Sequence, residues 1–435
     1  MTQPTVDPGR RTAADMLRRV VRIPQQDALP GTEDDRALPE RWVGFEGEDL
    51  RGADISGQKL RGAQFLNCDA EGAVFDGVDM RGAVLRNGSF MEARFADAVL
   101  EGADMRADPD EDRYKNDLDD RWRGAQFVRC RMKGADLSGE PLNHTWFGGS
   151  ILRNARFVRA SGMDTWMEDC VANGADFSDG SFNSFVVKGS GFDSAVFRSC
   201  DVYNPTWDQG LFWDADFISA SIDDGRLTDC DFKGADFTKA QIQSPLARDC
   251  FFDDTTMRDT EWDYADMSTC SFVRADFMGA EFGKSTFDEA DMTGAKLYGV
   301  TSKGSAFRGA TLEEAVLSGT YTHTDFSGAQ MRGADMSGDF SHCDFSEADL
   351  LGADMGCATF TECSFNGARM WPGQVDDPDD PMWDGVSFVG DREPSLPDVD
   401  DVAPSGLVTV REHMMTAPSG KRVVRHAHTR VQAGR

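Results

Sequence analysis

The chain has 435 residues, of which 40% are hydrophobic and 28% are charged, and its formal net charge is −31. This length is too great for one ordinary globular core but suits a repeat array. No apolar run approaches the roughly 18 residues of a membrane helix, and the N-terminus lacks the apolar stretch of a signal peptide. We therefore expect a soluble, cytoplasmic protein without membrane contact.

The charge is distributed unevenly along the chain. Residues 1–23 carry a net charge of +3 and residues 403–435 one of +5, which leaves −39 for the body between them. An acidic body disfavours direct binding of nucleic acid, because such binding requires groups that neutralise phosphate. A basic protein surface is the more natural partner.

Residues 1–43 are predicted to form an N-terminal helix and cap. The stretch 11–23 places its apolar side chains on one helical face and arginines on another. We expect this helix to dock on the acidic body or against a partner. Trp42 to Phe45 should cap the first repeat and Trp371 the last, since open strand edges need cover.

An apolar residue returns at every fifth place through residues 44–105 and again through residues 122–371. The residue two places earlier is usually small, as Ala53 is before Ile55. Both should point inward and the residue between them outward, as in a short strand. Glycine or a small polar residue often stands two places after the apolar site, where a corner could require a positive φ.

The cysteines indicate how many pentapeptides make one turn. Five of them stand at the small inward position and differ by multiples of twenty: Cys130, Cys170, Cys230, Cys250 and Cys270. Twenty residues, or four pentapeptides, therefore make one turn of a square coil. The 64 pentapeptides that we count predict about 16 turns, and a rod of roughly 75 Å at ~4.8 Å per turn.

Motifs such as GADFSDGSF and GADMSGDF resemble the consensus of the pentapeptide-repeat family, A-D/N-L/F-x-x. The resemblance covers about residues 44–371. It implies an all-β solenoid, a right-handed quadrilateral parallel β-helix, to which we add the short N-terminal helix and a C-terminal β-hairpin tail.

Three segments depart from the repeat. Residues 106–121 form a highly charged loop insertion, either solvated or, as the family resemblance also allows, in contact with a partner. Residues 372–402 are rich in Pro and Asp and indicate a linker. Residues 403–435 hold two β-prone runs around a turn and predict a basic hairpin tail.

Two steps of four residues also occur, one between Leu317 and Phe326 and one between Met336 and Phe340. Each step removes one residue from a turn and should distort a corner. Repeat drift is the simplest explanation for both.

The outward residues fall into four columns, each with a period of twenty. One column forms an acidic face with Asp136, Asp176, Asp216, Asp236 and Asp276. Two neighbouring columns share large apolar residues that we interpret as a partner interface: Trp146, Ile151, Trp166, Val171, Val186, Leu211, Leu246 and Phe251. The terminal segments, a second copy of the chain or a foreign protein could each cover this edge.

No pattern of catalytic or metal-binding residues emerges from the sequence. The six His stand near no Ser or Cys nucleophile motif, and His426 and His428 fit a basic tail better than a metal site. The cysteine column suits buried structural thiols, and the Asp column lies on a convex surface without a pocket. We predict no enzyme activity, no cofactor and no metal.

Two functions remain. The first is a scaffold or protein-interaction rod, suited to a larger assembly such as a phage or secretion particle. The second follows from the resemblance: relatives that protect type II topoisomerases such as gyrase are acidic DNA mimics, and the predicted rod is as long as roughly 22 base pairs at ~3.4 Å each. The chain departs from those relatives in its greater length, its basic tails, and Arg156 and Lys296 on the acidic face.

Overall fold

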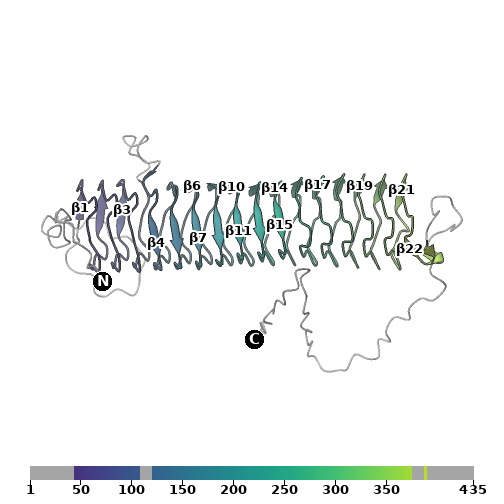
Figure 1. Ribbon diagram of the computed structural model, residues 1–435, viewed down its shortest axis with the longest axis horizontal. Coiled ribbons are helices and arrows are strands. Elements are labelled where there is room, and N and C mark those ends of the chain that lie inside the picture. The colour runs from purple at the N-terminus through teal and green to yellow at the C-terminus, as the bar shows by residue number, and fades with distance from the viewer. Residues whose placement is uncertain (1–43, 108–119, 375–386, 389–435) are drawn as a thin grey trace, which may run out of the picture. The chain divides into compact units, whose positions relative to one another are not determined.

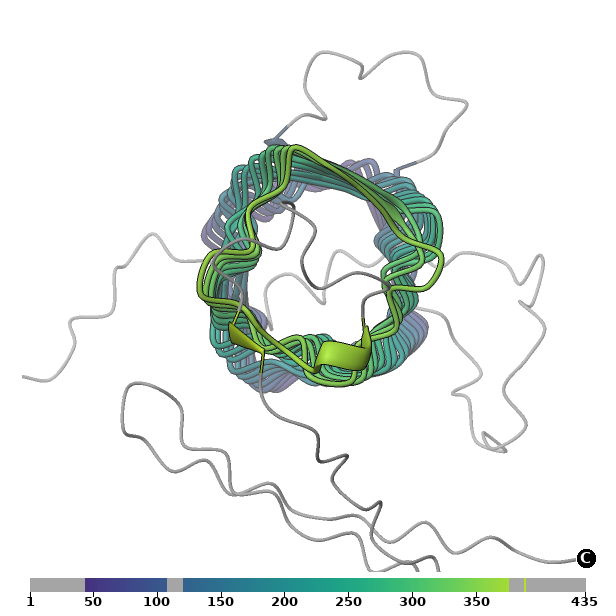
Figure 2. The same ribbon diagram turned by 90° about the vertical axis from the view of Figure 1, so that its right-hand side faces the viewer.

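The computed structural model describes residues 44–107, 120–374 and 387–388. Within them the chain winds as a parallel β-solenoid of about 15 turns with almost no helix (Figure 1), which confirms the predicted fold class. Figure 2 shows the turns superimposed around one axis. The predicted N-terminal helix and C-terminal hairpin lie outside the described residues.

Each strand is two or three residues long and pairs in parallel with a strand one turn away. A three-stranded sheet holds β1 (Gly44–Glu46), β2 (Gln64–Leu66) and β3 (Val84–Arg86). A seven-stranded sheet holds β4 (Gln126–Val128), β5 (Trp146–Gly148), β7 (Trp166–Glu168), β9 (Val186–Lys188), β11 (Thr206–Asp208), β13 (Arg226–Thr228) and β15 (Leu246–Arg248).

The longest sheet has eleven strands. It holds β6 (Ser161–Met163), β8 (Ser181–Asn183), β10 (Asp201–Tyr203), β12 (Ser221–Asp223), β14 (Gln241–Gln243), β16 (Glu261–Asp263), β17 (Glu281–Gly283), β18 (Thr301–Lys303), β19 (Thr320–Thr322), β20 (Asp339–Ser341) and β21 (Thr359–Thr361). A last pair consists of β22 (Arg369–Met370) and β23 (Ser387–Phe388), with the short 3₁₀ turn η3 (Pro372–Gln374) between them in sequence.

The strand register explains the period of the sequence. Val202 of β10 pairs with Ile222 of β12, twenty residues later, and isolated bridges such as Asp216 to Asp236 continue the same register on the other sides. Identical positions therefore stack along the axis. Phe217 lies between Phe197 and Phe237, with ring centroids 4.8 and 4.7 Å apart. Each turn thus contributes one buried residue from every fifth place to each of four stacks along the axis.

The corners also agree with the prediction. Ala195 and Phe197 are buried, Val196 between them is half-exposed, and the backbone of Ser199 turns with a φ of 51°. Glycines take the same left-handed conformation without strain, as Gly62 does with a φ of 64°. Many other corners use Asn or Asp, which tolerate this region better than most residues do.

The last turn is closed by a residue that the sequence did not single out. Gln374 of η3 donates from Nε2 to the carbonyl oxygens of Leu350 (2.7 Å) and Ala353 (3.0 Å), and its Oε1 accepts from the backbone of Gly352 (3.2 Å). Trp371, the predicted cap, is half-buried, and its ring lies over Gly352. The amide side chain thus satisfies backbone groups that would otherwise stand open at the end of the solenoid.

Both four-residue steps fall at one corner of successive turns. Thr301 pairs with Thr320 and Thr320 with Asp339, so each of these turns has 19 residues. At this corner the backbone leaves no room for a side chain at Gly319 and Gly338. A Cβ on Gly319 would lie 2.3 Å from the carbonyl oxygen of Val300, and one on Gly338 would lie 2.6 Å from that of Leu317.

We expect Gly319→Ala to destabilise the solenoid by about 3 kcal/mol, because rigid backbone must shift to admit the methyl group. The measurement is the urea midpoint of unfolding. Gly333→Ala is the control: Gly333 has a φ of 65° and nothing within 4 Å of an added Cβ, so only roughly 1 kcal/mol of conformational strain is expected. Equal losses in the two variants would contradict the close backbone approach.

A buried ion pair lies where the insertion rejoins the solenoid. Asp104 pairs with Asp136, a step of 32 residues in place of twenty. Arg121, the last residue of the predicted loop, is buried inside the solenoid and binds Glu140 at 2.7 Å. Trp122 donates to the same carboxylate at 2.8 Å. This polar contact was not expected from the sequence.

Backbone groups complete the environment of the pair. The guanidinium of Arg121 donates to the carbonyl oxygens of Gly88 (2.7 Å), Met105 (3.0 Å) and Leu85, and the backbone N–H of Ala107 donates to Glu140. Burial lowers the pKa of Arg121 and raises that of Glu140, and their mutual attraction opposes both shifts. The pair ties together the two ends of the interrupted turn.

Candidate interaction surface

The structure groups the predicted interface residues into two ladders. Four of them begin strands of the seven-stranded sheet: Trp146 in β5, Trp166 in β7, Val186 in β9 and, further along, Leu246 in β15. Isolated parallel bridges align the other four residues in the neighbouring ladder: Ile151, Val171, Leu211 and Phe251. The columns therefore run as the period of twenty indicated, while their role as an interface stays a prediction.

The eight residues differ in exposure. Trp166 is 44% exposed, Leu211 41% and Ile151 38%, which is a large exposure for apolar side chains of this size on two adjacent ladders. The other five are half-buried between their neighbours in the ladders: Trp146, Val171, Val186, Leu246 and Phe251.

Three further apolar side chains were missed by the sequence analysis. Met163 is 51% exposed, Tyr203 50% and Trp213 37%. Each stands one place after an inward residue, whereas only the place before had been considered. An apolar residue at this later position is the signal that could have found them. We call the exposed and half-exposed group over these turns the apolar surface: Trp146, Ile151, Met163, Trp166, Val171, Val186, Tyr203, Leu211 and Trp213.

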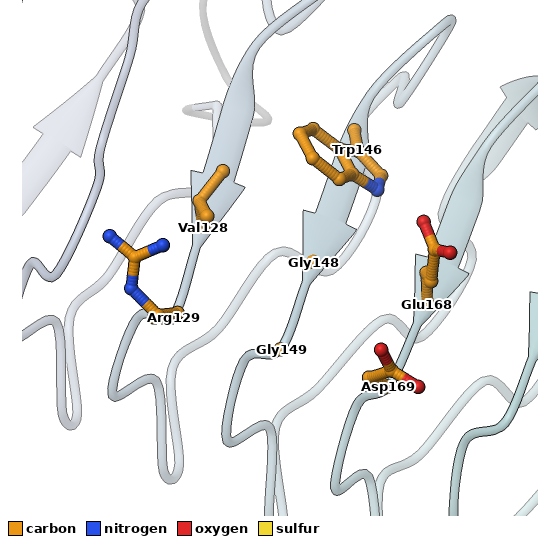
Figure 3. Close-up of a pocket in the computed structure, with 7 residues that line it drawn as sticks. All are labelled: Val128, Arg129, Trp146, Gly148, Gly149, Glu168 and Asp169. Atoms are coloured by element: carbon orange, nitrogen blue, oxygen red, sulfur yellow. The ribbon is translucent and has the colours of Figure 1, made fainter.

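A pocket of about 210 Å³ opens at one end of the apolar surface (Figure 3). It is lined by residues of three successive turns: Val128, Arg129, Trp146, Gly148, Gly149, Glu168 and Asp169. Gly148 and Gly149 have no side chains. The equivalent positions one turn earlier hold Val128 and Arg129, and those one turn later hold Glu168 and Asp169. The pocket occupies the space that the two missing side chains would fill.

The indole of Trp146 forms one wall of the pocket. Its ring lies over Gly148, where an added Cβ would stand 2.8 Å from Cζ2. Arg129 turns to Asp97, which accepts from both Nε and Nη2 at 2.8 Å. Glu168 lies 3.5 Å from Nζ of Lys188. The pocket therefore joins an aromatic wall to a rim with two carboxylates.

The acidic face has a structural role in the corners. Each of its five aspartates accepts a hydrogen bond of 2.9–3.2 Å from the backbone N–H two residues later: Asp136 from Ser138, Asp176 from Ser178, Asp216 from Ile218, Asp236 from Thr238 and Asp276 from Met278. These are Asx-type turns, which explains why the repeat places Asp there.

Arginines from neighbouring turns neutralise part of this face. Arg198 binds Asp216 at 2.5 Å and Arg258 binds Asp276 at 2.7 Å. Exposed pairs of this kind contribute little to stability, roughly 0–1 kcal/mol each, but they lower the negative potential that a partner meets.

The thiols behave as core groups. All ten cysteines are free, and eight of them are buried. Burial raises the pKa of Cys130 and Cys170 to about 12, so both stay protonated at neutral pH. In the part of the chain that the structure describes, no three His, Cys, Asp or Glu side chains converge to hold a metal ion.

The residues described here contain no helix with the length and apolar character needed to traverse a bilayer.

The family model for pentapeptide repeats matches in eight copies, over residues 49–87, 212–244, 270–301, 303–338 and 339–371. No curated protein matches the chain. Among solved structures, trypsin-treated QnrB1, a plasmid-mediated fluoroquinolone resistance protein, is similar at 22% identity with a TM-score of 0.26, over 48% of this chain and 92% of that one.

HetL, a pentapeptide repeat protein involved in heterocyst differentiation regulation from the cyanobacterium Nostoc sp. strain PCC 7120, is similar at 17% identity with a TM-score of 0.18, over 75% of this chain and 90% of that one. The family match coincides with the turns of four pentapeptides, the inward stacks and the left-handed corners described above. The matched segments are pentapeptide repeats of this family.

Proposed function

We propose that the chain is a non-enzymatic interaction scaffold whose apolar surface binds a protein partner. The observation that carries this proposal is the row of large apolar side chains on two adjacent ladders, of which Ile151, Trp166 and Leu211 are exposed. Leaving such side chains partly in water forgoes a fraction of the roughly 1.5–3 kcal/mol that full burial of each would contribute. Contiguous apolar surface of this kind is a common mark of an interface.

The site of action proposed is the cytoplasm, since free thiols such as Cys357, which is exposed, suit a reducing compartment. A larger assembly such as a phage or secretion particle would be one setting for a long solenoid of this type.

The test replaces Trp166 and Leu211 together by Glu. We expect the double variant to lose partner binding, or self-association if the partner is a second copy, while its melting temperature stays close to that of the wild type, because both side chains lie outside the core. Light scattering measures the mass in solution, and affinity capture with the bound partner quantified measures binding. Ser181→Glu, on the polar column, is the control. Unchanged mass and unchanged capture in the double variant would refute the proposal.

DNA mimicry toward a type II topoisomerase such as gyrase is the second candidate. It is supported by the net charge of −31 and by the column of Asp136, Asp176 and Asp236, which repeats along the rod at intervals of twenty residues or a multiple of it. The arginines at Asp136 (Arg106, 3.4 Å), Asp216 and Asp276 weaken this candidate.

A gyrase supercoiling assay distinguishes the two functions. Inhibition that weakens as salt is added, and that falls in a variant with Asp136, Asp176 and Asp236 changed to Asn, would favour mimicry, because competition with DNA depends on charge. Asn keeps the acceptor for the corner N–H, so the fold is retained. Absence of inhibition at micromolar protein would favour the scaffold.

A further inference from the structure

The pocket beside Trp146 has the chemistry of a site for a single cationic side chain. Its volume of about 210 Å³ lies below the ~300–1,000 Å³ of ordinary small-molecule pockets. One wall is the face of an indole, which attracts cations. Figure 3 shows Glu168 and Asp169 on the adjacent turn, on the side of the pocket opposite Arg129.

The positive groups near the pocket are already paired. Arg129 is held in a two-pronged contact with Asp97, at 2.8 Å through each nitrogen, so its charge is balanced within the protein. Lys188 reaches Glu168 at 3.5 Å, which leaves the carboxylate of Asp169 to add negative charge to the rim. An anionic group from a partner would meet the net negative charge of Asp169 here, whereas a cation would meet that carboxylate together with the indole.

We infer that this pocket receives an arginine side chain of the protein partner, with the guanidinium stacked on Trp146 and donating to Glu168 and Asp169. The inference rests on the proposed scaffold function and names the chemistry of its partner, a basic segment flanked by apolar residues. Arginine fits better than lysine, because its planar group can stack on a ring and donate to two carboxylates at once.

A second place on the apolar surface also favours a basic partner. Asp193 stands one turn before Trp213, and the backbone N–H of Ser194 donates to the carbonyl oxygen of Trp213 at 2.7 Å. Among the described residues, Oδ1 of Asp193 has no hydrogen-bond partner. Burial raises the pKa of Asp193, the hydrogen bond from Nδ2 of Asn173 at 2.9 Å lowers it, and Asp214 and Asp231 raise it. Three carboxyl groups therefore lie close together beside a second exposed Trp.

The experiment follows the indole N–H resonances of ¹⁵N-Trp-labelled full-length protein during titration with N-acetyl-arginine amide. Trp146→Phe assigns the signal of Trp146. We expect that signal to shift with arginine amide and not with its neutral isostere, N-acetyl-citrulline amide. The signal of Trp166, one turn away without the glycine pair, is the internal control and should stay in place.

The double variant Glu168→Gln, Asp169→Asn should weaken binding of arginine amide by about fivefold, as expected when a cation on an aromatic face loses its counter-charges. Asn suits the left-handed conformation of Asp169, whose φ is 53°, so the pocket keeps its shape. Equal shifts with citrulline amide, equal shifts at Trp166, or undiminished binding in the double variant would each overturn the inference.

Failure of this inference and failure of the scaffold function are separable. If the arginine amide does not bind but Trp166→Glu, Leu211→Glu still abolishes partner binding, the scaffold stands and the pocket does not select arginine. If the amide binds as expected while those surface variants change neither mass nor capture, the arginine site stands without the apolar interface.

Discussion

Phe217→Asp should unfold the middle turns of the solenoid at a temperature where the wild type is fully folded. Phe217 is completely buried and stacks on Phe197 and Phe237 in the turns on either side. Loss of the ring alone costs about 3–5 kcal/mol, and an unpaired carboxylate in its place adds several more. Circular dichroism during heating and hydrogen exchange measure the effect.

Hydrogen exchange also tests where the damage lies. Each turn contacts its neighbours, so protection should fall first around residues 197–237 and last near the two ends of the solenoid. Asp216→Asn is the matched control one residue away. It keeps the acceptor for the N–H of Ile218 and loses only an exposed contact with Arg198, so a change below about 1 kcal/mol is expected. Similar melting of the two variants would show that the inward positions are misassigned.

Glu140→Gln should destabilise the turns beside the insertion almost as severely. The substitution leaves the guanidinium of Arg121 charged and buried without its counter-ion, which costs about 3–5 kcal/mol. The carboxylate also accepts from Trp122 at 2.8 Å and from the backbone of Ala107, and the amide cannot accept all these donors equally well. Chemical unfolding measured by fluorescence should show the loss, because Trp122, one of nine Trp in the chain, is hydrogen-bonded to Glu140.

Asp120→Asn provides the comparison for a pair at the surface. Asp120 lies 3.5 Å from Arg123, and both side chains are about half exposed, so its loss should cost less than about 1 kcal/mol. A Glu140→Gln variant that is no less stable than Asp120→Asn would mean that the buried pair does not close the interrupted turn.

The pattern of the sequence was sufficient to predict the solenoid, because a stack of identical turns repeats one local rule. Phe217 and its counterparts twenty residues away must occupy equivalent places if each turn has four sides. The columns that place Trp166 beside Trp146 follow from the same arithmetic. Exposure did not follow from it: Leu246 is half-buried whereas Leu211 is exposed, since the packing of a surface side chain depends on its neighbours one turn above and below.

The candidate site was therefore only partly predictable. Met163 and Tyr203 were missed because an outward residue can also follow the inward one. The pocket beside Trp146 needs two glycines in one turn and two acids in the next, a coincidence that no single pentapeptide reveals.

The sequence by itself determined the period of five, the turn of twenty and the identity of the inward residues. Every turn follows the same backbone path and therefore needs a buried side chain at the same places, so the sequence must supply one at every fifth position. Only the tertiary structure decided which contacts complete the solenoid where the repeat is interrupted. Arg121 enters the core, Gly319 lies against the backbone of Val300, and Gln374 caps the last turn. These contacts join residues across turns at points where the repeat is broken, so no periodic rule can specify them.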